Sequence, residues 1–345
     1  MKKAWIFCYI FFPVVAFAGI LYFYGGWCEG GKEKVDLMPE IEPFETGTLK
    51  VSDIHELYYE LAGNPGGKPV MFLHGGPGGA SSPTMRRFCD PDKFLMVLHD
   101  QRGAGKSKPF GETRENTTQH LVEDIERLRK HLKLGKVILF GGSWGATLAL
   151  TYAETYPKNM NGLVLRGVFT ATKEEIDHFY HDGVKLFFPE VYAEFQKSMP
   201  EPETRPLAGH LFKLINEGNK ADKDKYARAW ARYEIKISGL DVPDDEVEHV
   251  LTLFDPYAFG ILENYYMANR CFLDEGQLLR DAKKLKGIPT VIVNGRYDTI
   301  CPPITAYRLH KQLPKSRLVI AEGAGHWMGE KPIEQALLKA MKGFE

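Results

Sequence analysis

Cysteine is scarce in this chain. The 345 residues include five cysteines, an odd number, and no two of them form a C-x-x-C pair. This scarcity argues against a disulfide framework and against a zinc site, so we expect a few buried thiols. The chain also lacks an excess of one charge, since 44 Lys and Arg stand against 45 Asp and Glu, for a net charge of −1. No basic block occurs, so nucleic acid is not an expected partner.

Motifs of metal and phosphate chemistry are missing as well. No H-E-x-x-H occurs, which disfavours a zinc peptidase. Gly105-Lys106-Ser107 matches the end of a phosphate-binding loop, but Asp100 stands where such a loop needs glycine. We therefore expect neither a metal nor an organic cofactor. Hydrophobic residues make up 44% of the chain and charged residues 26%, which indicates an ordinary folded protein rather than a disordered one.

The N-terminus carries a long apolar segment. Two lysines precede an uncharged stretch over residues 4–24, which is long enough for one helical crossing of a bilayer. One interpretation is a cleavable signal peptide with Ala16-Phe17-Ala18 as its cleavage site. Another is an uncleaved anchor, because apolar residues continue beyond that site, and a third is an upstream start codon ahead of Met38. We expect residues 1–37 to be a signal or anchor segment with a linker, so that the protein is membrane-anchored or exported.

Short apolar runs alternate with helical patterns through the rest of the chain. Strands are predicted at residues 49–51, 57–61, 70–73, 95–98, 137–140, 163–165, 290–293 and 318–320. Helices are predicted from a threonine cap at 117 or 118 to Gly135, over 146–156, and after each of the last two strands. Continuous apolar strands separated by helices indicate an α/β fold, with a mostly parallel sheet covered by helices on both faces.

One interval breaks this alternation. Between Leu165 and Thr290 the chain has helical patterns and many aromatic residues, and it is far longer than a crossover helix needs. We expect a helical cap inserted over the C-terminal edge of the sheet. The predicted parts are residues 38–170 and 286–345 for the core and 171–285 for the cap.

A nucleophile motif follows one of the predicted strands. Gly141-Gly142-Ser143-Trp144-Gly145 fits G-x-S-x-G, directly after an apolar run and directly before a helix. That context is typical of a nucleophile elbow, a tight turn that exposes the serine hydroxyl above the sheet. The helix behind the serine also directs backbone N–H groups toward developing negative charge. We therefore predict that Ser143 is a catalytic nucleophile.

A base and an acid follow two later strands. His326 lies in a glycine-rich loop just after the run 318–320, and Asp298 lies just after the run 290–293. The order Ser, Asp, His along the chain is that of α/β hydrolases. We predict that His326 accepts the proton of Ser143 and that Asp298 fixes the imidazole tautomer.

Glycines after the first apolar strand predict an oxyanion hole. His74-Gly75-Gly76-Pro77-Gly78 lets the backbone approach a reacting carbonyl group. We predict that the N–H of Gly76, with Gly75 as the weaker candidate, and the N–H of Trp144 bind the oxyanion. The loss of one such donor typically raises the barrier by about 2.7–4 kcal/mol.

Three of these motifs together resemble the prolyl iminopeptidases. They are the segment 74–78, Asp100-Gln101-Arg102-Gly103-Ala104-Gly105-Lys106-Ser107, and the segment 141–145, and Leu165-Arg166-Gly167-Val168-Phe169 also matches the family. These enzymes are α/β-hydrolase serine exopeptidases that release N-terminal proline. The resemblance runs from about residue 41 to 340. It implies small peptides with N-terminal proline as substrates and no cofactor, and it implies a cytoplasmic location as the alternative to a membrane anchor.

The cap contains further motifs of this family. Trp230-Ala231-Arg232-Tyr233-Glu234 is similar to W-x-x-W-E, with Tyr233 in place of the second tryptophan. Glu263-Asn264-Tyr265-Tyr266 is similar to E-N-H-Y, with Tyr265 in place of histidine. The resemblance implies that Glu234 and Glu263 bind the substrate amine, because a buried cation needs facing carboxylates. It also places Arg166 in the substrate site, with Phe169 and Tyr180 as an aromatic lining for the pyrrolidine ring.

Two other functions remain open from the sequence. The same triad serves a carboxylesterase or amidase that acts on neutral substrates. A hydrolase fold without catalysis, used as a binding protein or a membrane-tethered scaffold, is the alternative outside enzymes. The intact set of Ser143, Asp298 and His326 favours an enzyme.

Overall fold

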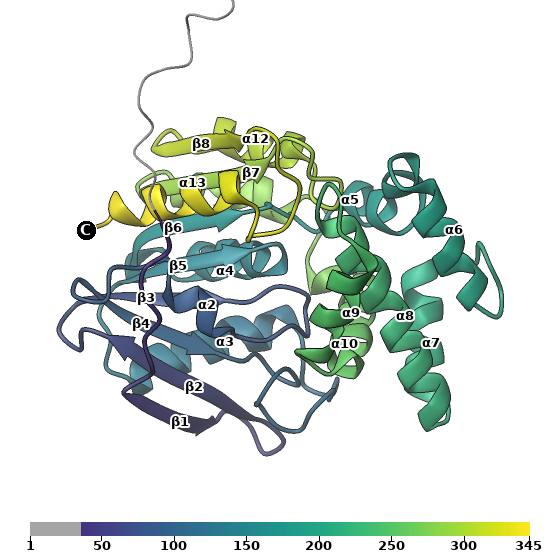
Figure 1. Ribbon diagram of the computed structural model, residues 1–345. Helices are drawn as coiled ribbons and strands as arrows, with labels where there is room; N and C mark the ends of the chain where they lie inside the picture. The colour runs from purple at the N-terminus through teal and green to yellow at the C-terminus, as the bar shows by residue number, and fades with distance from the viewer. Residues whose placement is uncertain (1–35) are drawn as a thin grey trace, which may run out of the picture. The chain divides into compact units, whose positions relative to one another are not determined.

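Eight strands form one sheet in the computed structural model, which describes residues 36–345 (Figure 1). In chain order they are β1 (Glu45–Lys50), β2 (Glu56–Gly63), β3 (Lys68–Leu73), β4 (Phe94–His99), β5 (Val137–Gly142), β6 (Met160–Arg166), β7 (Thr290–Gly295) and β8 (Ser316–Ala321). Each predicted apolar run lies in one of these strands, although the first strand ends one residue before Val51. The predicted α/β class is confirmed.

The sheet is mostly parallel. Its spatial order is β1-β2-β4-β3-β5-β6-β7-β8. Only β1 with β2 and β2 with β4 pair antiparallel, and the six strands from β4 to β8 pair parallel. Because the carboxyl ends of parallel strands meet at one edge of a sheet, the loops after β3, β5, β6, β7 and β8 converge there.

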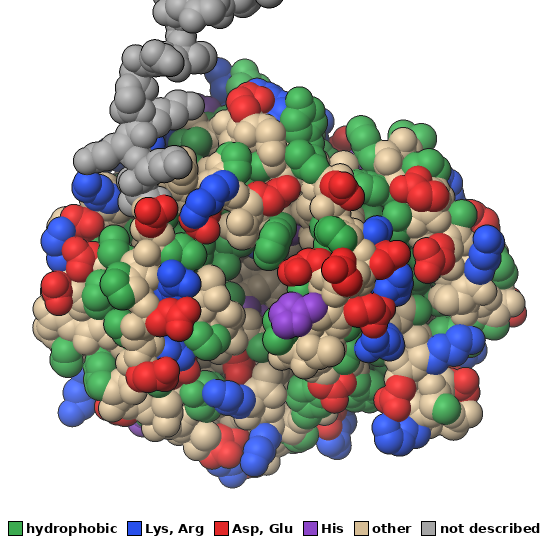
Figure 2. All heavy atoms as spheres, in the orientation of Figure 1, with side chains coloured by type: hydrophobic (Ala, Val, Ile, Leu, Met, Phe, Trp, Pro, Cys, Tyr) green, Lys and Arg blue, Asp and Glu red, His purple; other side chains and the backbone are tan. Residues whose placement is uncertain are grey.

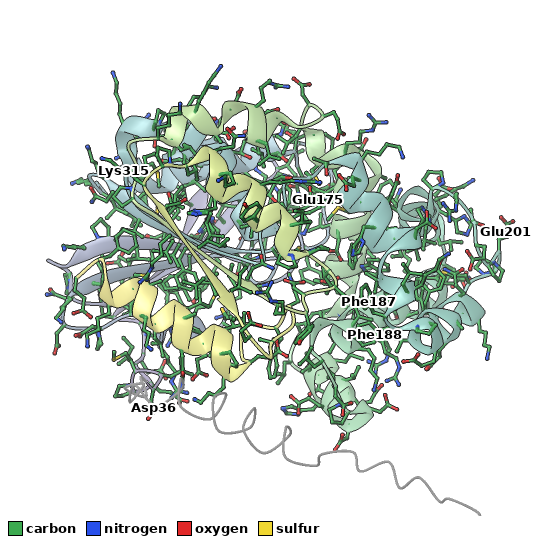
Figure 3. The ribbon with its side chains drawn as sticks, turned by 90° about the horizontal axis from the view of Figure 1, so that it is seen from above. Asp36, Glu175, Phe187, Phe188, Glu201 and Lys315 are labelled. Carbon is green, nitrogen blue, oxygen red and sulfur yellow. The ribbon has the colours of Figure 1, made fainter. Side chains whose placement is uncertain are left out.

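Helices cover both faces of this sheet. They are α2 (Pro83–Arg86), α3 (Thr118–His131), α4 (Trp144–Thr155), α12 (Pro303–Gln312) and α13 (Lys331–Lys342). Helix α13 lies on one face, and α3, α4 and α12 lie on the other (Figure 3). All six residues of β4 are buried, as continuous apolar strands between two helix layers must be.

Helix α3 shows why sequence signals place starts better than ends. Thr117 is the N-cap, and its side chain accepts a hydrogen bond from the backbone N–H of His120, as predicted. The predicted end at Gly135 is wrong, because the helix ends at His131 and Lys133 adopts a left-handed backbone with φ 52°. The backbone N–H groups of Lys133 and Leu134 donate to the carbonyl oxygens of Lys130 and Arg129, which satisfies the helix end with lysine in place of glycine at the turn.

The interval between β6 and β7 contains helices and no strand in the described chain. Its α-helices are α5 (Lys173–Asp177), α6 (Pro189–Ser198), α7 (Leu207–Glu217), α8 (Lys220–Ser238), α9 (Asp244–Thr252), α10 (Pro256–Ala268) and α11 (Gln277–Asp281). Helices α5 to α10 gather at one end of the sheet (Figure 1). Helix α10 begins with Pro256 behind the N-cap Asp255, a strong start signal.

The Glu175 carboxylate fixes the passage from the sheet into these helices. Its two oxygens accept from the backbone N–H and hydroxyl of Thr170, and one also accepts from the N–H and hydroxyl of Thr172. Thr172 and Glu175 thereby form a capping box at the start of α5. Figure 3 labels Glu175 where the two parts meet.

Loops at the carboxyl edge of the sheet pack directly on the cap helices. Gly78 after β3 lies against the backbone of Ala258 in α10. The backbone N–H groups of His326 and Trp327 both donate to the carbonyl oxygen of Ser238, at the end of α8. Residues 36–345 form one compact unit, so the division into parts 38–170, 171–285 and 286–345 stays a prediction.

The apolar stretch 4–24 lies outside the described residues, so the anchor or export signal stays a prediction. Within residues 36–345, no helix combines the length and the apolar character that a bilayer crossing requires. The three cysteines in this part, Cys89, Cys271 and Cys301, are free and buried, as the composition predicts.

Helix α4 buries an acidic residue without a partner. The side chain of Glu154 is 6% exposed, and neither of its carboxyl oxygens has a hydrogen-bond partner. Burial and the charge of Asp281 raise the pKa of Glu154 to about 8. Between about pH 4.5 and pH 8, the Glu154 carboxyl is therefore protonated in the folded state and ionised in the unfolded state.

We predict that Glu154→Gln stabilises the protein increasingly with pH. The pKa of Glu154 is higher in the folded state than in the unfolded state. Ionisation of Glu154 therefore does not lower the free energy of unfolding below about pH 4.5, and it lowers this free energy increasingly as pH rises through 8. The gain in the free energy of unfolding for the variant should rise by on the order of 2–4 kcal/mol between pH 5 and pH 9. Urea titrations at both pH values measure it, with the exposed Glu217→Gln on α7 as the control. An equal gain at both pH values contradicts the prediction.

Candidate active site

Ser143 occupies a strained turn between β5 and α4. Its backbone has φ 56° and ψ −125°, a conformation that side chains rarely adopt. Small neighbours allow the turn, because a Cβ on Gly145 would collide with the carbonyl oxygen of Leu73 and one on Gly141 would collide with that of Gly145. The turn is the nucleophile elbow that the motif predicts.

Asp298 and His326 meet at the ends of β7 and β8. Asp298 Oδ2 lies 2.8 Å from His326 Nδ1, and both residues are buried. Asp298 Oδ1 accepts from the backbone N–H groups of Ile300 and Cys301 at 3.1 and 2.7 Å. With its oxygens accepting in this way, Asp298 favours the tautomer that carries a proton on Nδ1 and a lone pair on Nε2 of His326.

The guanidinium group of Arg166 donates a hydrogen bond to this lone pair. Its Nη1 lies 2.9 Å from His326 Nε2 and also donates to the His326 carbonyl oxygen at 3.1 Å. In the described residues no hydrogen bond joins Ser143 to His326, and the Ser143 hydroxyl instead contacts the Cys301 thiol. Proton transfer from Ser143 to His326 therefore requires the Arg166 guanidinium to leave Nε2 and the Ser143 hydroxyl to turn toward it.

The Cys301 thiol is an inert neighbour of Ser143. Burial raises the pKa of Cys301 well above its usual range, and the hydrogen bond with Ser143 only partly opposes this effect. The thiol therefore stays protonated beside the Ser143 hydroxyl. A protonated thiol is a weak nucleophile, so Cys301 does not compete with Ser143 for the predicted role.

Three of the sequence motifs are joined by one chain of hydrogen bonds. Gln101 donates from its backbone N–H to His74 Nε2 at 3.0 Å and from Nε2 to the His74 carbonyl oxygen at 2.9 Å. The indole Nε1 of Trp144 donates to Gln101 Oε1 at 2.8 Å. Burial lowers the pKa of His74, so its neutral ring can accept at Nε2. The loops after β3, β4 and β5 are thus held in one arrangement around Ser143.

The predicted oxyanion donors lie beside the nucleophile. Trp144 is the first residue of α4, so its backbone N–H has no partner within the helix. Gly76 lines a cavity together with Ser143, and its φ of 103° is one that favours glycine. Gly75 also approaches the Ser143 side chain. Both candidate loops therefore reach the reacting position, and their role stays a prediction.

The cavity beside Ser143 is small and mostly apolar. Its volume is about 10 Å³, room for about one water molecule, and it is lined by Gly76, Ser143, Phe169, Phe179, Glu263, Met267, Ile300 and Cys301. Phe169 lies where the sequence predicts an aromatic lining. Tyr180 instead stacks on Trp230 with ring centroids 4.7 Å apart and lines a separate cavity, so its predicted contact with substrate is not part of this arrangement. Its neighbour Phe179 faces the Ser143 cavity.

Two acidic side chains from different cap helices meet at this cavity. Glu263 of α10 is 2% exposed and accepts a hydrogen bond from Trp230 Nε1 at 2.6 Å. Glu263 also shares a hydrogen bond with Glu234 of α8, and the buried Oε2 of Glu234 has no partner. The charge of Arg166 acts on Glu234 from the sheet side. The structure thus brings Glu234, Glu263 and Arg166 together, as the resemblance implies.

Burial makes this carboxyl pair hold a proton. Desolvation raises the pKa of Glu234 to about 7, although Glu263 and Arg166 act in the opposite direction. Desolvation and the neighbouring Glu234 raise the pKa of Glu263 well above its usual range. Two carboxyl groups in contact cannot both ionise easily, so they share a proton.

Sequence reasoning missed half of the cavity lining. Phe179, Met267, Ile300 and Cys301 come from three separate segments. Ile300 and Cys301 follow Asp298 closely, and this proximity to a predicted catalytic residue is the one signal that could have found them. Met267 lies four residues after Glu263 and so shares its face of α10, and this helical spacing is the signal that could have found it.

This geometry and the sheet order define an α/β hydrolase. A family model described as alpha/beta hydrolase fold matches residues 68–331. Among solved structures, an alpha/beta hydrolase from a Medee basin deep-sea metagenome library is 18% identical with a TM-score of 0.62, covering 86% of this chain and 96% of that one. An esterase from Exiguobacterium antarcticum is 21% identical with a TM-score of 0.61, covering 86% and 98%. These two structures support the fold.

More similar relatives place the chain within this class. A proline iminopeptidase from Arabidopsis thaliana is 44% identical, covering 89% of this chain and 81% of the relative. One from Xylella fastidiosa is also 44% identical, covering 89% and 99%. A third, from Neisseria gonorrhoeae, is 39% identical, covering 87% and 96%. The chain belongs to the proline iminopeptidase family of α/β hydrolases, as the motifs indicate.

We predict that Asp298→Asn strongly slows covalent labelling of Ser143 by a fluorophosphonate probe. Asparagine cannot favour the Nδ1–H tautomer of His326 as a carboxylate does, so the labelling rate should fall by on the order of 10³–10⁴-fold. Mass spectrometry of the labelled peptide measures the rate. The exposed Asp241→Asn, in the turn after α8, serves as the matched control. A rate close to that of the unchanged protein would show that the Asp298–His326 contact is only structural.

Proposed function

We propose that this protein is a prolyl aminopeptidase that hydrolyses the bond after an N-terminal proline, with Ser143 as nucleophile, His326 as base and Asp298 as its orienting acid. The observation that carries the proposal is the carboxyl pair. Glu263 lines the same cavity as Ser143 and shares a hydrogen bond with Glu234. An esterase for neutral substrates has no need of two buried acids beside its nucleophile, and their burial costs stability.

Recognition of the substrate begins at this pair. The secondary ammonium of an N-terminal proline replaces the shared proton, so that both carboxylates become charged and accept its hydrogen bonds. Phe169, Phe179 and Met267 line the cavity that the pyrrolidine ring enters, and their side chains move apart to admit it. Binding of the amine at one end and the ring in the cavity places the carbonyl carbon over Ser143.

Hydrolysis then proceeds in two steps. Ser143 attacks the carbonyl carbon while His326 accepts its proton, and the backbone N–H groups of Gly76 and Trp144 hold the oxyanion. His326 returns the proton to the leaving amine as the C–N bond breaks, which leaves proline as an ester on Ser143. Water, deprotonated by His326, attacks this ester and releases free proline and the serine hydroxyl.

The first test compares two substrates in the same active site. Proline p-nitroanilide should be hydrolysed with a kcat/KM at least about 100-fold above that of p-nitrophenyl butyrate corrected for its uncatalysed rate, because only the anilide carries the amine. Ser143→Ala should abolish both activities, and Ser198→Ala at the half-buried end of α6 is the control. Efficient butyrate hydrolysis without anilide hydrolysis would replace this proposal with a carboxylesterase. Lack of both activities, together with no fluorophosphonate labelling, would favour a non-catalytic protein.

The carboxyl pair predicts a pH dependence that only amine substrates show. Because the pKa of Glu234 is raised to about 7, the pair binds a cation poorly below that pH, and kcat/KM for proline p-nitroanilide should rise as pH increases toward 7–8. The butyrate ester uses the same triad, so dividing the two profiles removes the titration of the catalytic groups.

Glu234→Gln should remove this relative rise and lower kcat/KM for the anilide by on the order of 10²-fold, with little effect on the ester. The matched control is Glu217→Gln on the exterior of α7. Two results would show that this pair does not bind the amine. One is a ratio of the two profiles that does not vary with pH, and the other is an unchanged anilide rate in Glu234→Gln.

A further inference from the structure

A second and larger cavity opens on the other side of the carboxyl pair. Its volume is about 540 Å³. Its lining comes from the segment 79–83 after β3, from α8, and from α9 with the turn that leads into α10: Gly79, Ala80, Ser81, Ser82, Pro83, Glu234, Ile235, Ser238, Val250, Leu253, Phe254 and Phe259. We call it the outer groove. Figure 2 shows the molecule hollowed near the centre of one face, where the sheet part and the cap helices meet.

The outer groove adjoins the catalytic centre at three points. Glu234 lines the groove and shares a hydrogen bond with Glu263, which lines the Ser143 cavity. The loop after β3 contributes Gly76 to the cavity and Gly79 to the groove. Ser238 lines the groove, and its carbonyl oxygen accepts from the backbone N–H of His326 at 2.8 Å.

Covalent geometry decides which part of a substrate enters the groove. In a peptide with N-terminal proline, the amine nitrogen and the nitrogen of the scissile bond are separated by only two carbon atoms, so they lie about 3 Å apart. An amine held by Glu234 and Glu263 therefore places the leaving nitrogen at the inner end of the groove, on the side of the His326 backbone. The chain that follows proline has to continue outward from there.

The lining of the groove favours apolar substrate side chains over charged ones. Ile235, Val250, Leu253, Phe254 and Phe259 give it a wide apolar wall, and the Phe254 and Phe259 rings pack edge to face at 5.8 Å. Glu234 is the single charged residue among the lining residues in the described chain, and it is committed to the amine. An acidic side chain in the groove would lose its hydration and find no cation.

We propose that the outer groove is the binding site for the residue after proline and that it makes the enzyme selective for substrates with a large apolar residue at this second position. The inference rests on the proposed function, because it needs proline in the Ser143 cavity. Leu253 is the residue that sets this preference at the mouth of the groove. Its side chain is 68% exposed, so substrates can bury it and substitutions there spare the fold.

The test measures proline release from Pro-Leu-NH₂, Pro-Gly-NH₂ and Pro-Asp-NH₂. Amidated substrates are used because a free carboxylate would itself lie in the groove. Burial of one leucine side chain predicts a kcat/KM about tenfold or more higher for Pro-Leu-NH₂ than for Pro-Gly-NH₂, and lowest for Pro-Asp-NH₂. Leu253→Lys should lower the Leu-to-Gly ratio severalfold and raise the Asp-to-Gly ratio, since a cation now faces the second residue.

Leu186→Lys is the matched control, because Leu186 is a 75% exposed leucine in the cap that does not line the groove. It should keep the ratios of the unchanged protein. Equal rates for all three substrates, or ratios in Leu253→Lys that match those of the control, would overturn the groove proposal while the aminopeptidase proposal stands. Failure to release proline from any of the three would overturn the proposed function itself.

Discussion

Two buried carboxyl groups in contact impose the main constraint on this molecule. Glu234 and Glu263 come from helices α8 and α10, and burial makes full ionisation of the pair costly. A protein without use for such a pair would gain stability by replacing it with apolar residues of similar size. The sheet and the helices around it hold this pair at a fixed place beside Ser143.

The sheet and the cap divide the chemistry between them. Parallel strands end at one edge, so the loops after β5, β7 and β8 bring Ser143, Asp298 and His326 to a common place regardless of their distance along the chain. The cap contributes the carboxyl pair and much of the apolar lining. The hydrogen bonds from the His326 loop to Ser238 and the contact of Gly78 with α10 join the two parts, so the acids cannot move far from the nucleophile. In the proposed function, specificity for an N-terminal amine thus depends on helix packing rather than on the triad.

The sequence predicted the parts of this site that depend on local signals. Apolar runs marked every strand, and G-x-S-x-G between a strand and a helix marked Ser143 because the tight turn itself needs glycines. Asp298 and His326 were found from their places after strands. The predicted end of α3 was wrong because Lys133, not Gly135, takes the left-handed position that closes the helix. The contact of Arg166 with His326 Nε2 and the choice of Phe179 over Tyr180 were not predictable, because both depend on rotamers and on packing between distant segments.

Calorimetry of ligand binding tests the central role of the carboxyl pair most directly. Proline amide is titrated into the Ser143→Ala protein at pH 6.5 in two buffers of different ionisation enthalpy, and the difference in heat gives the number of protons released. The account requires that about one proton leave the Glu234–Glu263 pair as the ammonium binds, and that this release disappear in a protein that also carries Glu234→Gln. Tight binding of proline amide without proton release would show that the cation is held elsewhere.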